Sequence, residues 1–349
     1  MCYEFYGLQE APFTLNPDPR FLFLSENHKG ALLHLQHRLA QGDGFMVLLG
    51  DAGTGKTTIL RTLLRSLSND VRIAFITLRI PSFRDLLINL CHDFGLDYHG
   101  ETPELLLALG DFLRRNAQEG KKALLILDES HHLKNKLLEE IRLLSNYETD
   151  QSKLLQILFA GQTELEKRLR RPELKQLRER ITLQYALRPL HREDTMRYIR
   201  WRLQIAGAPE QENIFSPEAV EAIYECTNGV PRLINRMCDN ALLLGYMLQA
   251  RSINATIVHK AELRSSFNDE STRFEIRAPG WVGLSPANGK SQHGAKRHSL
   301  QTRSGELDAT IEDHRSAILA SAGEPVRNGK FFMEKLSQFL RNPFNFIKG

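Results

Sequence analysis

The feature that most restricts the fold of this chain is the string GDAGTGKT at residues 50–57. It fits the phosphate-loop pattern GxxxxGK[ST], with the apolar run FMVLL before it and the helix-like TTILRTLLRSL from residue 57 onward. Glycines let the backbone curl so that its N–H groups face phosphate oxygens, and the helix N-terminus adds positive potential. Strand, glycine loop and helix in this order predict a nucleotide phosphate site in an α/β fold. With both flanks in place, a glycine turn of no consequence is the weaker interpretation.

The loop residues have separate expected roles. Lys56 should reach the β- and γ-phosphates, and the Thr57 hydroxyl should ligate Mg²⁺. The residues expected to contact the nucleotide are Gly50, Asp51, Ala52, Gly53, Thr54, Gly55, Lys56, Thr57 and Thr58.

A phosphate loop needs a second acidic partner for Mg²⁺. The apolar string ALLIL ends in Asp128, which we expect to hold Mg²⁺ through a bound water, and Glu129 should orient and polarise the attacking water. The alternative is a buried strand followed by an acidic helix cap. One further strand-like run, residues 72–78, separates the two motifs, which is compatible with the ASCE class of phosphate-loop ATPases. No NKxD motif follows, so ATP is favoured over GTP.

Three further polar residues complete the expected site. Gln162 follows the apolar run LLQILFAG, where a γ-phosphate sensor would stand; the alternative is a loop glutamine. Arg178 and Arg180 precede the last strand-like run, and Arg180 is the better candidate to reach a neighbouring subunit's γ-phosphate. The alternative for both is a solvated basic helix end. Arg232, in GVPR, stands in the first turn of a later helix and could contact the γ-phosphate from there.

The apolar pattern predicts the fold. Near-continuous apolar runs at 45–49, 72–78, 124–128, 154–160 and 181–187 are typical of parallel strands buried on both faces. Helical patterns between them predict a five-stranded parallel sheet with helices on both faces. The predicted domains are an α/β ATP-binding domain at 1–190, an all-helical lid at 191–265, a disordered linker at 266–328 and an amphipathic segment at 329–349.

Composition places few further limits. A formal charge of +4 does not by itself indicate nucleic acid, and four scattered cysteines without a CxxC fit a reducing compartment. The N-terminus lacks a signal peptide and the longest apolar run, 241–248, is too short for a membrane span. We therefore expect a cytoplasmic protein. The basic cluster KSQHGAKRHSLQTR is interpreted as a solvated linker, whereas the terminal segment could lie in the inner-membrane interface, on the ATPase domain or on a partner.

The adjacent His131 and His132 raise the alternative of a metal site. Neighbouring residues on a helix point about 100° apart, and zinc needs further ligands at suitable spacing. We expect instead a polar loop or a first helical turn.

These motifs give the chain a resemblance to AAA+ ATPases of the general secretion pathway protein A (ExeA/GspA) type, and in particular to the ATPase associated with exosortase/PEP-CTERM exopolysaccharide loci. The similar strings are FYGLQEAPFTLNPDPRFLFLSENHKGAL, GDAGTGKTT (Walker A), LLILDE (Walker B), LLSNYETDQSKLLQILFAGQTEL, LRERI and GVPRLINRMCDNALLLG, which span about residues 1–265. The resemblance implies that segment 12–24, within an adenine-side segment 1–40, packs near the base, and that the chain oligomerises. It also implies that Gln162 is sensor 1, Arg180 the arginine finger and Arg232 sensor 2.

The chain departs from this family in two ways. It has DESHHL where members commonly have DEAQNL, and from these residues we expect neither the membrane span nor the peptidoglycan-binding region of secretion-type members. The expected function is Mg²⁺-dependent ATP hydrolysis that switches a homo-oligomer serving envelope secretion or exopolysaccharide export. Two alternatives stay open: a DNA-associated helper ATPase of the transposition type, disfavoured by the modest charge, and a non-hydrolysing ATP-binding scaffold, disfavoured by Glu129.

Overall fold

The computed structural model describes residues 2–15, 18–77, 80–149, 153–208 and 213–269. The predicted linker, apart from residues 266–269, and the predicted amphipathic segment 329–349 lie outside the described residues.

The core of the α/β part is a five-stranded parallel sheet, which confirms the predicted fold class. Its strands are β1 (Phe45–Leu49), β2 (Val71–Ile76), β3 (Lys122–Leu127), β4 (Gln156–Gly161) and β5 (Ile181–Ala186), in the order β2-β3-β4-β1-β5. Every residue of β1 and β4 is buried, which accounts for the apolar sequence of β1 and for that of β4 after Gln156. Because β4 lies between β1 and β3, the loops after these three strands meet at one edge of the sheet.

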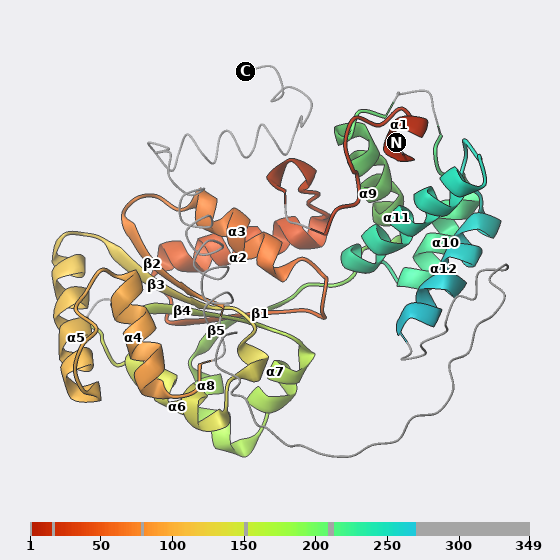
Figure 1. The fold of residues 1–349 in the computed structure, drawn as a ribbon. Coiled ribbons are helices and arrows are strands. Elements are labelled where there is room, and N and C mark those ends of the chain that lie inside the picture. The colour runs from red at the N-terminus through yellow and green to blue at the C-terminus, as the bar shows by residue number, and fades with distance from the viewer. Residues whose placement is uncertain (1, 16–17, 78–79, 150–152, 209–212, 270–349) are drawn as a thin grey trace, which may run out of the picture. The chain divides into compact units, whose positions relative to one another are not determined.

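Helices cover both faces of the sheet (Figure 1). On one face lie α2 (Glu26–Gln41) and α3 (Lys56–Ser66), packed against the side of β1 that carries Met46 and Leu48. The opposite face carries Val47 and is covered by α4 (Phe83–Asp93), α5 (Thr102–Gln118), α6 (Asn135–Leu144), α7 (Thr163–Leu169) and α8 (Lys175–Glu179). Side chains alternate between the faces along a strand, so each strand contributes to two apolar cores.

The helical part consists of α9 (Arg192–Ile205), α10 (Pro217–Thr227), α11 (Pro231–Met247) and α12 (Ala255–Asp269). Ser216 caps α10 by accepting the N–H of Ala219, and Asn228 ends it in the left-handed conformation. Helix α12 continues to Asp269, past the predicted lid boundary at residue 265. Its sequence from 255 to 269 contains no glycine or proline that would end it earlier.

The N-terminal residues pack with these helices and not with the sheet. After the short helix α1 (Cys2–Phe5), the side chains of Tyr6, Phe13 and Phe21 are buried in the same apolar core as α9–α12. Arg202 of α9 fixes this segment: its Nε donates to the Pro12 carbonyl at 2.5 Å and its guanidinium lies over the Phe21 ring. The prediction grouped residues 1–40 with the α/β domain, whereas the structure divides them: Leu24 and α2 pack against the sheet, and the described residues before them pack with the helical part.

Across the described residues, no helix combines the length and the apolar character that crossing a bilayer demands.

Candidate nucleotide-binding and active site

The loop after β1 is shaped by its glycines and by one buried lysine. Gly53 and Gly55 have φ angles of 82° and 101°, which favour glycine, and α3 begins directly after them at Lys56. Lys56 is buried, and its Nζ donates to the carbonyls of Gly50 at 2.8 Å and Asp51 at 3.1 Å. Burial lowers the pKa of Lys56, while the nearby Glu129 and Asp128 raise it. The ammonium group thus spans the concave loop in which phosphates would sit.

The two predicted Mg²⁺ residues meet at this loop. The Thr57 hydroxyl donates to Asp128 Oδ2 at 2.9 Å, and the Glu129 N–H donates to Asp128 Oδ1 at 2.9 Å. Burial raises the pKa of Asp128, and these two hydrogen bonds oppose that rise. A hydroxyl and a carboxylate side by side are the hard oxygen donors that Mg²⁺ takes in proteins, so the residues present fit the ion.

Glu129 follows in a left-handed conformation, with φ of 52°, and begins a single 3-10 turn, Ser130–His132. Ser130 is buried and holds this turn by donating to the Leu127 carbonyl at 2.6 Å. The Glu129 side chain remains 45% exposed and lines the same cavity as Lys56. A carboxylate in this position can accept a proton from water beside the phosphates.

Gln162 is the cap residue between β4 and α7, and it also lines the cavity. Its Nε2 lies 3.1 Å from His131 Nε2. The position follows from the strand order, because β4 ends between the phosphate loop of β1 and the acidic pair of β3.

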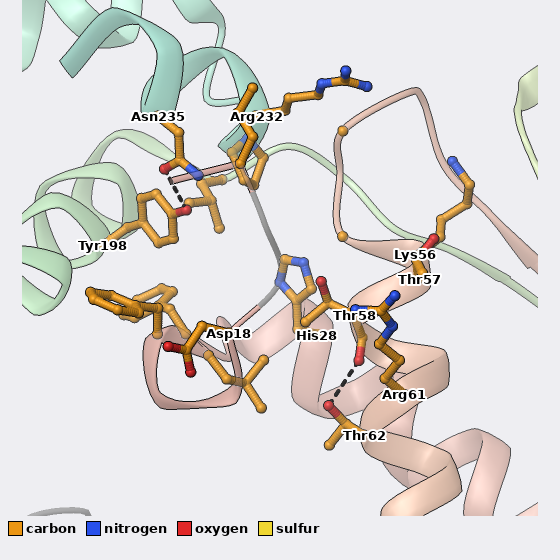
Figure 2. A pocket seen from close by; sticks show the side chains of 18 of the residues that line it. Asp18, His28, Lys56, Thr57, Thr58, Arg61, Thr62, Tyr198, Arg232 and Asn235 are labelled. Atoms are coloured by element: carbon orange, nitrogen blue, oxygen red, sulfur yellow. Dashed lines mark hydrogen bonds between the residues drawn. The ribbon is translucent and has the colours of Figure 1, made fainter. Parts of the chain in front are cut away.

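Lys56, Thr57, Glu129 and Gln162 line a cavity of ≈ 560 Å³, a size typical of small-molecule sites (Figure 2), whereas Asp128 lies behind Thr57 and is not part of the lining. In Figure 2, Lys56 and Thr57 lie on one side and Tyr198 and Asn235 on the other, with His28 between them. The N-terminal segment contributes Thr14, Leu15, Asp18, Phe21, Leu22 and Phe23 to the wall. This wall lies where the sequence predicts contact with the base, a role that stays a prediction.

The predicted arginines differ in their placement. Arg232 lines the cavity, and its backbone N–H donates to the Gly53 carbonyl at 3.4 Å, so the first turn of α11 contacts the phosphate loop. Arg180 does not line the cavity; it donates to Ser145 Oγ at 2.6 Å and Asn146 Oδ1 at 2.9 Å. Arg178 donates to backbone carbonyls of its own neighbourhood. The role of Arg180 toward another subunit stays a prediction.

One residue of the site, His28 of α2, was not predicted from the sequence. It is 4% exposed, its Nε2 lies 2.9 Å from the Thr54 carbonyl, and its Nδ1 lies 2.6 Å from Ser25 Oγ. Nε2 must carry the proton to donate to Thr54, so Nδ1 accepts from the Ser25 hydroxyl. In the sequence His28 stands one turn after the helix-capping Ser25, and this pattern alone does not predict a contact with the phosphate loop.

The expectation that the His131 and His132 side chains diverge is wrong. Their rings lie 4.0 Å apart because the chain forms a 3-10 turn here, and one ligand atom each of Glu129, His131 and His132 lie within 4.8 Å of one another. The two ring nitrogens of His131, however, face other protein groups: Nδ1 lies 3.2 Å from Glu129 Oε2 and Nε2 lies 3.1 Å from Gln162 Nε2. His132 is exposed.

Comparison with known proteins tests the resemblance predicted from the sequence. Residues 37–169 match the AAA domain family. General secretion pathway protein A of Aeromonas hydrophila is 42% identical over 275 residues, which cover 78% of this chain and 50% of that protein. The chain thus spans about half the length of this relative.

Two further similarities are more limited. ATP-dependent target DNA activator B of Escherichia phage Mu is 34% identical over 102 residues, 29% of this chain and 31% of that protein. The structure of the Aeropyrum pernix ORC2 protein has a TM-score of 0.55 at 17% identity, covering 76% of this chain and 72% of that one, which shows a shared fold. Residues 37–169 therefore match the AAA domain, and the comparisons confirm the predicted resemblance of the chain to AAA+ ATPases of the general secretion pathway protein A type.

Proposed function

We propose that this chain binds ATP together with Mg²⁺ and hydrolyses it. The observation that carries the proposal is the contact between Thr57 and Asp128 at 2.9 Å, beside the buried Lys56. Glu129 and Gln162 line the cavity next to this pair. Phosphate binding, metal binding and activation of water each need different groups, and all of them lie at one edge of the sheet.

The residues act as follows in this proposal. Backbone N–H groups of residues 50–57 and the Lys56 ammonium hold the β- and γ-phosphates. Thr57 and Asp128 hold Mg²⁺, which when bound neutralises phosphate charge. Glu129 accepts a proton from water as its oxygen bonds to the γ-phosphorus, and the bond from that phosphorus to the β-phosphate oxygen breaks, giving ADP and phosphate. Gln162 donates an amide N–H to a γ-phosphate oxygen.

The helical part and the N-terminal segment supply the rest of the proposed site. Arg232 senses the γ-phosphate from α11, whose first turn already contacts Gly53. The apolar wall of Leu15, Phe21 and Phe23 takes the base. The sequence lacks the NKxD motif of guanine-binding proteins, and we therefore propose ATP as the nucleotide.

We further propose that the chain works as a homo-oligomer whose conformation changes with hydrolysis. Arg180 would then leave Ser145 and Asn146 to reach the γ-phosphate of a neighbouring subunit. Similarity to general secretion pathway protein A supports service to secretion. Exopolysaccharide export, and a place on the cytoplasmic side of the inner membrane, are proposed from the sequence motifs alone. Peripheral membrane contact through residues 329–349 belongs to the same proposal.

A second candidate is a DNA-associated ATPase, favoured by the similarity to the phage Mu target DNA activator. Binding of duplex DNA at about 50 and about 200 mM salt discriminates the two, because contacts to DNA phosphates make affinity fall steeply as salt rises. Tight, salt-dependent binding supports the DNA role, and its absence supports the secretion role.

Steady-state release of phosphate from ATP tests the main proposal. We expect turnover that requires Mg²⁺ and is lost in Lys56→Ala, with His132→Ala, an exposed residue outside the cavity lining, as the matched control. A purified, folded chain that binds no ATP, or turnover that survives Lys56→Ala, would contradict the proposal.

A further inference from the structure

His131 stands between the two groups to which catalysis is assigned. Its Nδ1 lies 3.2 Å from Glu129 Oε2, and its Nε2 lies 3.1 Å from Gln162 Nε2. The His131 side chain is only 9% exposed. Among the described residues, neither Glu129 Oε2 nor His131 Nδ1 has a well-aligned hydrogen-bond partner, so each is the other's nearest candidate.

The chemistry of the three groups fixes the direction of their hydrogen bonds. If the Gln162 amide donates to Nε2, the imidazole proton is on Nδ1 and points to the Glu129 carboxylate. The opposite tautomer would place the Nδ1 lone pair against a carboxylate oxygen, which is repulsive. Burial and the adjacent His132 lower the pKa of His131, while Glu129 opposes this, so the neutral ring required here is favoured.

The backbone around His131 is tied to the same helix that Gln162 begins. Arg168 of α7 donates to the His131 carbonyl and to Asn135 Oδ1, each at 2.8 Å, and to the Leu133 carbonyl. The ring therefore has a fixed position relative to Gln162, which stands six residues before Arg168 in the chain. A shift of α7 would be transmitted to the turn that carries Glu129.

We propose that His131 is a positioning residue that couples Gln162 to Glu129, an inference that rests on the proposed function. The Gln162 amide carries two N–H donors. It can donate one to the γ-phosphate and one to His131. A bound γ-phosphate then fixes the orientation of the Gln162 amide, which fixes the His131 ring. The ring in turn orients the Glu129 carboxylate toward the attacking water. Hydrolysis is then linked to occupancy of the γ-phosphate position.

Two substitutions separate this polar role from packing. His131→Leu keeps bulk and removes both nitrogens, and we expect kcat to fall at least about tenfold, with the dissociation constant for ATP changed less than about threefold. His131→Gln keeps an amide that both donates and accepts, and should retain kcat within about threefold. The matched control is His132→Ala, which removes an exposed ring that lies 4.0 Å from the His131 ring at an interplanar angle of 40°. Above neutral pH the His131 ring is uncharged with or without His132, so kcat measured there should not change.

A double-mutant cycle with Gln162→Ala tests the coupling itself. In the Gln162→Ala background, His131→Leu should lower kcat by less than about twofold, because the link is already broken. Equal loss of kcat in His131→Leu and His131→Gln, no loss in His131→Leu, or a full tenfold loss in the Gln162→Ala background would each overturn the inference. Far-UV circular dichroism and ATP binding establish that each variant is folded. If the unaltered chain does not hydrolyse ATP, it is the proposed function that fails and not the coupling alone.

Discussion

Replacing His28 by alanine should lower both the stability of the fold and the affinity of the phosphate loop for nucleotide. The substitution removes the donor to the Thr54 carbonyl at 2.9 Å and the acceptor for the Ser25 hydroxyl at 2.6 Å. A buried polar group left without a partner costs about 1–3 kcal/mol, and the lost ring leaves a cavity. Together these predict a free energy of unfolding lowered by about 3 kcal/mol, or a Tm lowered by about 5 °C.

The matched control is His28→Gln, whose amide nitrogen can occupy the place of Nε2 and donate to Thr54. Urea unfolding should place His28→Gln well above His28→Ala in stability, and binding of a fluorescent ATP analogue should weaken in His28→Ala alone. Equal stability of His28→Ala and the unaltered chain would refute the reasoning, because it would show that the hydrogen bond from His28 to the Thr54 carbonyl contributes nothing to the free energy of unfolding.

The same residue predicts a pH dependence. Burial lowers the pKa of His28 below its ordinary value of 6.5, which it regains on unfolding. As the pH falls below 6.5, His28 takes up a proton in the unfolded chain but not in the folded chain. The free energy of unfolding therefore decreases as the pH falls, and it stops decreasing once the pH is below the folded pKa of His28. His28→Gln lacks this contribution. Between about pH 7 and about pH 5, which brackets the ordinary histidine pKa, the unaltered chain should therefore lose stability relative to His28→Gln. A stability difference that stays constant over this range would contradict the conclusion that His28 is neutral in the folded chain.

Three further substitutions test other contacts. Arg202→Met leaves the Pro12 carbonyl without its donor and should lower stability by about 2–4 kcal/mol and speed proteolysis ahead of α2; unchanged cleavage would speak against the role of Arg202. Gly53→Ala places a Cβ 2.6 Å from Arg232 Cβ at a residue whose φ is 82°. The affinity for ATP, measured by calorimetry, should therefore fall about tenfold, whereas unchanged affinity would show that the loop relaxes without cost. Thr57→Ala should raise the Mg²⁺ concentration for half-maximal turnover about tenfold, and Thr57→Ser, which keeps the hydroxyl, should not. The same Mg²⁺ requirement in both variants would show that the Thr57 hydroxyl does not ligate Mg²⁺.

Sequence patterns predicted the central strands β1, β3 and β4 because these are buried on both faces. The edge strands β2 and β5 were expected to be buried in the same way, but they are only partly buried because each has a neighbouring strand on one side alone. The apolar run FMVLL coincides with β1, and the other four predicted strands overlap β2 to β5 with ends shifted by one or two residues. The phosphate loop, Asp128 and Gln162 were predictable for a related reason: each directly follows a buried parallel strand, and parallel strands bring their carboxyl ends to one edge.

Long-range packing was not predictable in the same way. Tyr6, Phe13 and Phe21 have no periodic spacing, so nothing local showed that they belong to the core of α9–α12. His28 and His131 each act through one or two hydrogen bonds to residues distant in sequence or brought together by a turn, and such partners are defined only by the fold. The divergence expected for His131 and His132 assumed an α-helix, whereas the chain forms a 3-10 turn.

The central claim, that Glu129 activates water for ATP hydrolysis, is tested most directly by Glu129→Gln. The substitution keeps the size of the side chain and removes the proton acceptor. Single-turnover measurements with Mg²⁺ and labelled ATP should show a chemical step slowed at least about a hundredfold, with ATP affinity kept within about threefold, so that ATP stays bound and uncleaved. Cleavage at the rate of the unaltered chain would contradict the account.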